Sequence, residues 1–106
     1  DDMGNKFGIV FARYEYRNEL VEFIRNSGNP HNIKYFIVVA LDKGENGQKS
    51  YRSINDDFDV SEIAVIHGGG GHPAAASVNL TAKQKSRALV LKRKEGLKYL
   101  AAASYK

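Results

Sequence analysis

The stretch at residues 33–42, IKYFIVVALD, is apolar almost without interruption and constrains the fold more than any other feature. A run of this kind is typical of a β-strand that is buried on both faces of a sheet. Its uninterrupted part, residues 35–41, is far shorter than the roughly 20 residues of a membrane-spanning helix. We therefore expect this segment at the centre of a sheet with flanking helices, and no association with a membrane.

Periodicity and turn residues predict two further strands and a helix in the first half. Residues 6–16 are rich in aromatic and β-branched side chains and favour a strand. Residues 18–26 carry apolar side chains at helical spacing, and Gly28 is a natural helix stop. An Asn-Gly pair after the buried run is the typical signal of a hairpin, which predicts a strand at 48–54. The first half thus predicts strand, helix, strand, hairpin and strand.

The second half predicts short elements around a glycine run. A short helix is expected at about 60–66, with Asp59 or Ser61 as its cap. One helical turn with Pro73 at its start, a short strand at 77–80 and a last helix at 82–103 capped by Thr81 follow. The predicted fold class is α/β, with a mixed sheet of about four to five strands and flanking helices.

Length and cysteine content narrow the class of protein. The chain has 106 residues, which is the size of a single domain, and it contains no cysteine. Disulfide frameworks and thiolate metal sites are therefore excluded. Because the polar N-terminus has no apolar stretch of signal-peptide type behind it, we expect a cytoplasmic, intracellular protein.

Charge is distributed unevenly along the chain. The first 80 residues carry 8 Lys and Arg against 11 Asp and Glu, a net charge of −3, whereas residues 81–106 carry 8 against 1, a net charge of +7. The basic tail is consistent either with nucleic-acid binding or with a solvated helix face. On a helical wheel its basic residues lie beside an apolar stripe that includes Leu89, Leu97 and Leu100. That stripe is consistent with core packing, with a homodimer contact or with a surface for another protein.

Four consecutive glycines, residues 68–71, stand directly before His72. Glycine accepts positive φ, so such a run lets backbone N–H groups converge on an anion. His72 would add a side-chain donor to that site. A flexible connector is the alternative interpretation.

The wider pattern resembles the DHHA1 domain, the C-terminal substrate-binding half of DHH-family phosphoesterases. Its family pattern is a strand that ends in Ser-x-Arg-Ser, a short helix with a D-V-x-x-I-A core, and a G-G-G-H-x-x-A-A-G loop. This chain has SYRS at 50–53, DVSEIA at 59–64 and GGGGHPAAA at 68–76, in that order. The resemblance covers about residues 6–80, so we expect one DHHA1-like domain with an added basic helix at 82–103. Ser77 stands near the position of the family's last glycine.

The resemblance implies that the candidate site residues bind substrate. Arg52 would contact a phosphate or base of a short single-stranded nucleic acid or nucleotide, since its planar fork matches phosphate oxygens. The loop would supply backbone donors from Gly69, Gly70 and Gly71, and His72 would donate to a phosphate oxygen. Two further candidates from the same motif are Ser50 and Ser53. The alternatives are that Arg52 pairs with Asp56 or Asp57 and that His72 only completes a turn.

The resemblance also implies chemistry that this chain does not carry. In the family, Mn²⁺ or Mg²⁺ is held by an N-terminal domain with an Asp-His-His motif, and that motif is absent from these 106 residues. The acidic residues at 56, 57 and 59 have no histidine beside them, whereas a two-metal centre needs several converging ligands. We therefore expect no catalytic and no metal-binding residue here. The DHH catalytic domain would be a partner in cis, and this fragment alone would be inactive.

The sequence leaves more than one function open. The first hypothesis is the substrate-binding domain of a metal-dependent phosphoesterase, such as an exonuclease that hydrolyses short oligonucleotides. The second is a tRNA-binding module like the C-terminal part of alanyl-tRNA synthetases, which the basic helix would suit. Others are a phosphodiesterase domain for cyclic dinucleotides or 3′-phosphoadenosine 5′-phosphate, and a small protein-interaction domain.

Overall fold

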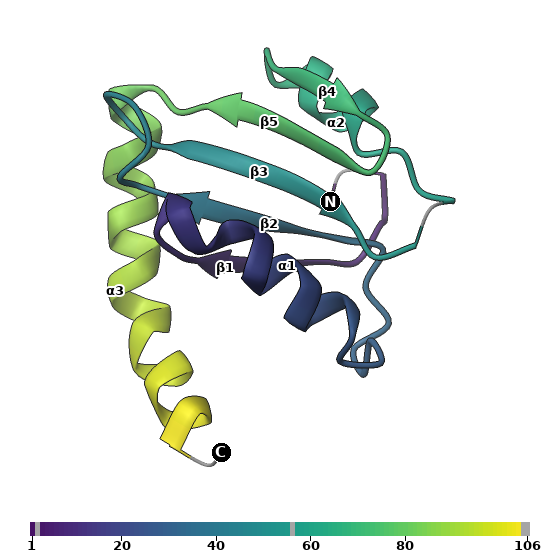
Figure 1. Ribbon diagram of the computed structural model, residues 1–106. Helices are drawn as coiled ribbons and strands as arrows, with labels where there is room; N and C mark the ends of the chain where they lie inside the picture. Colours follow the sequence, from purple (N-terminus) through teal and green to yellow (C-terminus); the bar gives the residue numbers. More distant parts are fainter. Residues whose placement is uncertain (2, 56, 105–106) are drawn as a thin grey trace.

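The structure is a computed structural model that describes residues 1, 3–55 and 57–104, with side chains up to residue 93 of the last helix. Within that part, a five-stranded sheet has the strand order β1-β2-β3-β5-β4 (Figure 1). The elements are, in chain order, β1 (Phe7–Phe11), a 3-10 helix η1 (Tyr14–Tyr16), α1 (Arg17–Arg25), β2 (Tyr35–Ala40), β3 (Gln48–Ser53), α2 (Ser61–Ile66), β4 (Gly70–His72), β5 (Ala75–Asn79) and α3 (Ala82–Ser104).

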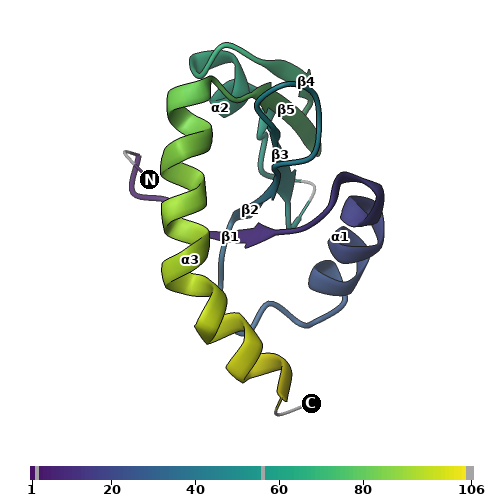
Figure 2. The ribbon, with the colours of Figure 1, turned by 90° about the vertical axis from the view of Figure 1, so that its left-hand side faces the viewer.

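The sheet is mixed. β1 and β2 run parallel and are connected through α1, whereas the β2–β3, β3–β5 and β4–β5 pairs are antiparallel. Seen edge-on, α1 lies on one face of the sheet, and α2 and α3 lie on the other (Figure 2). The α/β fold class with a mixed sheet and flanking helices is therefore confirmed.

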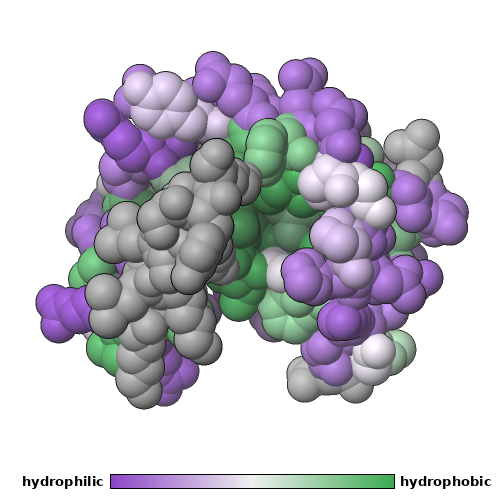
Figure 3. Space-filling view, turned by 90° about the horizontal axis from the view of Figure 1, so that it is seen from below, coloured by the Kyte–Doolittle hydropathy of each residue, from purple (hydrophilic) through white to green (hydrophobic). Residues whose placement is uncertain are grey.

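Two apolar clusters, one on each face, hold the layers together, and apolar residues show as green in the middle of the view from below (Figure 3). On the α1 face, Val21 packs against Phe36 and Val38. The larger cluster lies on the other face, where β2 and β3 meet α2 and the start of α3; its fully or nearly buried members are Tyr35, Ile37, Val39, Tyr51, Val60, Ala64, Ala76, Val78 and Leu80. Because alternate residues of a strand point to opposite faces, β2 supplies both clusters, and all six of its residues are buried.

The prediction that the apolar run occupies the centre of the sheet is wrong by one strand. The middle strand is β3, and β2 lies between β1 and β3. Burial on both faces arises because α1 covers β2 from one side while the larger cluster covers it from the other. α1 does not extend over β3 (Figure 1), so the α1 face of β3 is free to carry polar side chains.

Two local predictions are also corrected. The first strand ends at Phe11 and not at residue 16, since the chain turns there and Tyr14 donates its backbone N–H to the Asp42 carboxylate at 2.9 Å. The helical turn expected at Pro73 is instead the turn of a hairpin between β4 and β5. The carbonyl oxygen of Pro73 accepts the N–H of Val60 at 2.8 Å, which joins this turn to the start of α2.

The strand expected at 77–80 is β5, which begins two residues earlier, and the N-cap of α2 is Val60 and neither Asp59 nor Ser61. Three further predictions are confirmed. The Asn-Gly signal does mark the β2–β3 hairpin, and α1 and α2 lie within one residue of their expected bounds. Thr81 caps α3: its Oγ1 accepts the N–H of Gln84 at 3.2 Å, and Gln84 Oε1 accepts the N–H of Thr81 at 2.9 Å. The side chains of Leu97 and Leu100 lie outside the described residues, while Leu89 is partly exposed. No helix in the described part is both long and apolar enough to cross a membrane.

We predict that Gly69→Ala destabilises the fold while Gly70→Ala does not. A Cβ on Gly69 would lie 2.0 Å from the carbonyl oxygen of Ser77, whereas a Cβ on Gly70 would meet nothing within 4 Å. The backbone of the β4–β5 hairpin must shift to admit the first methyl group, at a cost of about 1–3 kcal/mol. Chemical denaturation of both variants measures the difference; equal unfolding free energies would contradict the close packing of this hairpin.

We predict a stabilising contribution from Asp59 that disappears in acid. Its carboxylate accepts the backbone N–H and the hydroxyl of Ser61, and the hydroxyl bond is the main cause that lowers the pKa of Asp59. A lowered folded-state pKa stabilises the fold above the unfolded pKa, and this is lost as the pH falls through the folded value. Asp59→Asn should therefore lower Tm at neutral pH but not at strongly acidic pH. The control is Asp57→Asn, an exposed carboxylate of the same loop, and a gap in Tm that persists in acid would contradict the prediction.

Candidate anion-binding site

The candidate site begins with the alternation of β3. Arg52 lies opposite Phe36, and Ser50 lies opposite Val38, in the β2–β3 register. Directly opposed residues share a face of the sheet. Because Phe36 and Val38 pack on α1, the side chains of Ser50 and Arg52 belong to the α1 face.

Two rows of residues cross β3, β5 and β4 on that face. One row runs from Arg52 through Ala75 to His72. The row beside it runs from Ser50 through Ser77 to Gly70. Two strand spacings separate the ends of each row, so the Cα atoms of Arg52 and His72 lie about 10 Å apart. The sheet thus brings two segments that are 20 residues apart in sequence onto one surface.

A cavity of about 200 Å³ lies over these rows, where the start of α1 meets the uncovered part of the sheet. It combines basic and hydroxyl side chains with backbone from the glycine strand. Its lining residues are Tyr14, Arg17, Gln48, Ser50, Arg52, Gly70, Gly71, Ala75, Ala76 and Ser77.

Arg52 is the charged centre of the site. It is partly buried, and its Nη2 donates to Oδ1 of Asn18 on α1 at 3.3 Å. Burial lowers the pKa of Arg52, and the charges of Arg17 and Arg25 lower it further. Arg17 and Arg25 therefore lie close enough to Arg52 for their charges to act on it.

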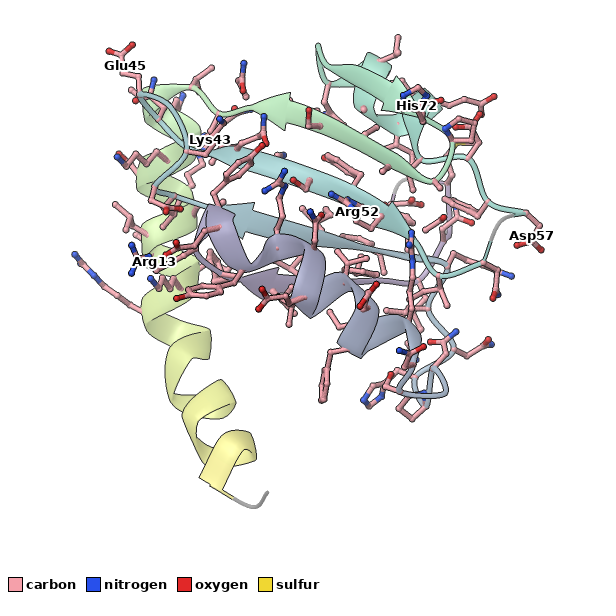
Figure 4. The ribbon with its side chains drawn as sticks, viewed as in Figure 1. Arg13, Lys43, Glu45, Arg52, Asp57 and His72 are labelled. Atoms are coloured by element: carbon pink, nitrogen blue, oxygen red, sulfur yellow. The ribbon has the colours of Figure 1, made fainter. Side chains whose placement is uncertain are left out.

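No carboxylate in the described part of the chain pairs with Arg52. The alternative in which Arg52 pairs with Asp57 is therefore wrong. The other proposed partner, Asp56, lies outside the described residues. Figure 4 shows Asp57 at the tip of a loop, away from Arg52. An arginine that is partly desolvated, repelled by its neighbours and left without a counter-ion favours the binding of an anion.

The glycine run contributes unevenly. Gly70 and Gly71 line the cavity as part of β4. Gly69 does not, because its N–H already donates to the carbonyl oxygen of Ala64 at 2.8 Å and its Cα faces the backbone of Ser77. His72 is exposed on the same face as Arg52 but lies at the edge strand, outside the cavity lining (Figure 4). Within the run, Gly69 therefore supports the fold, whereas Gly70 and Gly71 form part of the cavity wall.

The two serines of the motif point to opposite faces. Ser50 is 4% exposed and lines the cavity, while Ser53 is 1% exposed and lies on the other face. The Oγ of Ser53 has no hydrogen-bond partner. The structure therefore brings Ser50 to Arg52 and separates Ser53 from both. Ser77, which stands near a family glycine, lies at the middle of the floor and adds a hydroxyl side chain there.

Sequence reasoning missed the part of the site that comes from the N-terminal third. Tyr14 and Arg17 line the cavity, and Asn18 holds Arg52. Residues 6–16 are typical of one continuous strand, so their sequence does not indicate the turn at η1 that places Tyr14 and Arg17 beside the cavity. Gln48 could have been found, since a strand that places Ser50 and Arg52 on one face also places Gln48 there.

The described residues do not fit the Mn²⁺ or Mg²⁺ that the family resemblance implies. No group of three His, Cys, Asp or Glu side chains converges among them. The Asp59 carboxylate is engaged with Ser61, and Asp57 is exposed in its loop. No carboxylate stands among the described residues that line the cavity at Arg52. Its donor set suits an anion and not a divalent cation.

The chain shares sequence similarity with part of a known enzyme. No family model matches the chain. The chain is similar to oligoribonuclease NrnB of Bacillus subtilis (strain 168), with 40% identity over 76 residues. These residues are 70% of this chain, which spans only 17% of the length of that relative.

We predict that Arg52→Gln leaves the fold as stable as the wild type or stabilises it, whereas Arg25→Gln destabilises it. The first change removes a repelled charge. The second removes the bonds that Arg25 donates to the carbonyl oxygens of Ser53 at 3.0 Å and Ala74 at 3.3 Å, at a cost of about 1 kcal/mol. Thermal unfolding at low salt compares the two, and a lower Tm for Arg52→Gln than for Arg25→Gln would show that Arg52 serves the fold.

Proposed function

We propose that this chain is a DHHA1-like domain that binds the phosphate of a short oligonucleotide or nucleotide for a DHH-family phosphoesterase. Three motif segments in the family order support this proposal, as does the similarity to an oligoribonuclease. The catalytic domain and its metal ions would belong to a DHH domain in cis. The cytoplasmic location and a homodimer remain predictions from the sequence.

The observation that carries the proposal is the position of Arg52 in its cavity, where none of the carboxylates that the structure describes pairs with it. A guanidinium presents donors in a planar fork that matches two phosphate oxygens. One of its nitrogens already contacts Asn18, which fixes the orientation of the group. A phosphate would neutralise the repulsion between Arg52 and Arg17, so binding would relieve an unfavourable interaction of the free protein.

The remaining lining would complete the contacts to the phosphate. The hydroxyls of Ser50 and Ser77 lie on the floor of the cavity, and the backbone of Gly70 and Gly71 forms its wall. His72, at the end of the Arg52 row, would contact a part of the ligand that extends past the edge strand. In this proposal these residues bind and orient the phosphate. The contribution to catalysis would be positioning of the scissile bond.

We predict that Arg52→Gln weakens the binding of a 5′-phosphorylated RNA dinucleotide to this chain by about 10-fold to 100-fold, the usual range for one lost charged hydrogen-bonding group. The matched control is Arg87→Gln, which removes the same charge from exposed α3 on the other face of the sheet. It should bind like the wild type. Isothermal titration calorimetry at fixed salt measures all three proteins.

Two outcomes would contradict the proposal. Equal losses from Arg52→Gln and Arg87→Gln would mean that overall positive charge, and not the cavity, attracts the ligand. A steep fall of affinity with salt, together with tighter binding of tRNA than of dinucleotides, would favour the tRNA-binding alternative. A clamp on one or two phosphates gives only a shallow dependence on salt.

A further inference from the structure

A second group of cations lies directly beside the Arg52 cavity. The guanidinium carbon of Arg17 lies 3.7 Å from the centre of the Tyr14 ring, and the Nζ of Lys43 lies 4.3 Å from the same point. The two positive groups therefore lie within about 8 Å of each other. An aromatic ring attracts cations through its quadrupole without neutralising their charge.

The backbone around Tyr14 holds this arrangement in place. The N–H of Tyr14 donates to the Asp42 carboxylate at 2.9 Å, and its carbonyl oxygen accepts Nη1 of Arg17 at 3.0 Å. Tyr14 is thus tied both to the loop after β2 and to the first turn of α1. The Asp42 carboxylate is engaged with this backbone N–H, and no ion pair of Arg17 or Lys43 with a carboxylate occurs among the described residues.

The Tyr14 group is continuous with the site proposed above. Tyr14 and Arg17 line the Arg52 cavity, and the charge of Arg17 acts on Arg52. A cationic track therefore runs from Arg52 on β3, past the start of α1, to Lys43 in the loop after β2. Figure 4 shows the two ends of the track, Arg52 over the sheet and Lys43 beyond the end of β2.

We propose that Tyr14, Arg17 and Lys43 form a second phosphate subsite, which takes the next phosphate of a nucleotide chain whose first phosphate binds at Arg52. This inference rests on the proposed function. A mononucleotide has one phosphate and reaches only the first subsite. A dinucleotide with a 5′-phosphate spans both, so the track distinguishes oligonucleotides from mononucleotides by the number of phosphates they present.

The subsite has a consequence for the release of the product. Contacts that only the longer chain makes favour substrate over the mononucleotide that hydrolysis releases. The exposed position of Lys43 suits this role, since a flexible ammonium follows the ligand without a fixed geometry. Arg52, which Asn18 holds in one orientation, would supply the phosphate contact of fixed geometry.

The test compares adenosine 5′-monophosphate with 5′-phosphorylated adenylyl-adenosine, titrated against this chain. Lys43→Gln should weaken dinucleotide binding by about threefold to 10-fold and leave mononucleotide binding unchanged. The slope of log affinity against log salt should fall by about 0.7 for the dinucleotide, the value for one lost phosphate contact of a single strand. Lys34→Gln is the control, because it removes the same charge from an exposed position just before β2, at the opposite end of that strand.

The outcomes separate the two proposals. If Arg52→Gln weakens both ligands but Lys43→Gln weakens neither, the first subsite stands and the second is overturned. If Lys43→Gln weakens both ligands equally, or if the wild type binds both equally well, the second subsite is likewise overturned. If the wild type binds neither ligand, or Arg52→Gln leaves both affinities unchanged, the proposed function itself fails.

Discussion

The strict alternation of β3 is the constraint on which the rest of the structure depends. β3 is the middle strand, and each of its two faces has a different environment. Tyr51 points into the large apolar cluster, while its neighbours Ser50 and Arg52 point to the face that α1 leaves uncovered. A slip of one residue in the β2–β3 register would bury the arginine and expose the tyrosine. The same pairing that builds the core therefore also determines where the charge is displayed.

The site is assembled at some cost to the fold. Arg17 and Arg25 lie near Arg52, whose pKa is lowered because water is partly excluded from it and, to a lesser extent, because the charges of Arg17 and Arg25 act on it. Hydrogen bonds from Arg52 to Asn18 and from Arg25 to two backbone carbonyl oxygens hold these groups in place. Arg52 itself has little value for stability, since no carboxylate in the described part of the chain compensates its charge. It is what a preorganised anion site requires.

The sequence predicted the fold class and most helices and strands, and four of its candidate site residues line one cavity in the structure. These predictions succeed where a local signal is strong: the continuous apolar run, the Asn-Gly turn and the capping threonine each act over a few residues. The strand that the glycine run forms could not be predicted. Its pairing with β5 is a backbone contact between strands, which glycine permits but does not specify. The contribution of Tyr14 and Arg17 to the cavity could not be predicted for a similar reason. Their place beside Arg52 follows from how α1 crosses the sheet, and no spacing in the sequence encodes that crossing.

The wall of the cavity at β4 has a consequence for how the site tolerates mutation. Gly70 and Gly71 present only main chain, so no substitution there except proline, which lacks the backbone N–H, deletes a hydrogen-bonding group in the way that a change at Arg52 deletes a guanidinium. Every other substitution only adds atoms. At Gly71 the added Cβ would lie 2.6 Å from the carbonyl oxygen of Ala75, while at Gly70 the space is open. Substitutions along β4 are therefore limited by the volume that they add, whereas a substitution at Arg52 on β3 is limited by the charge that it removes.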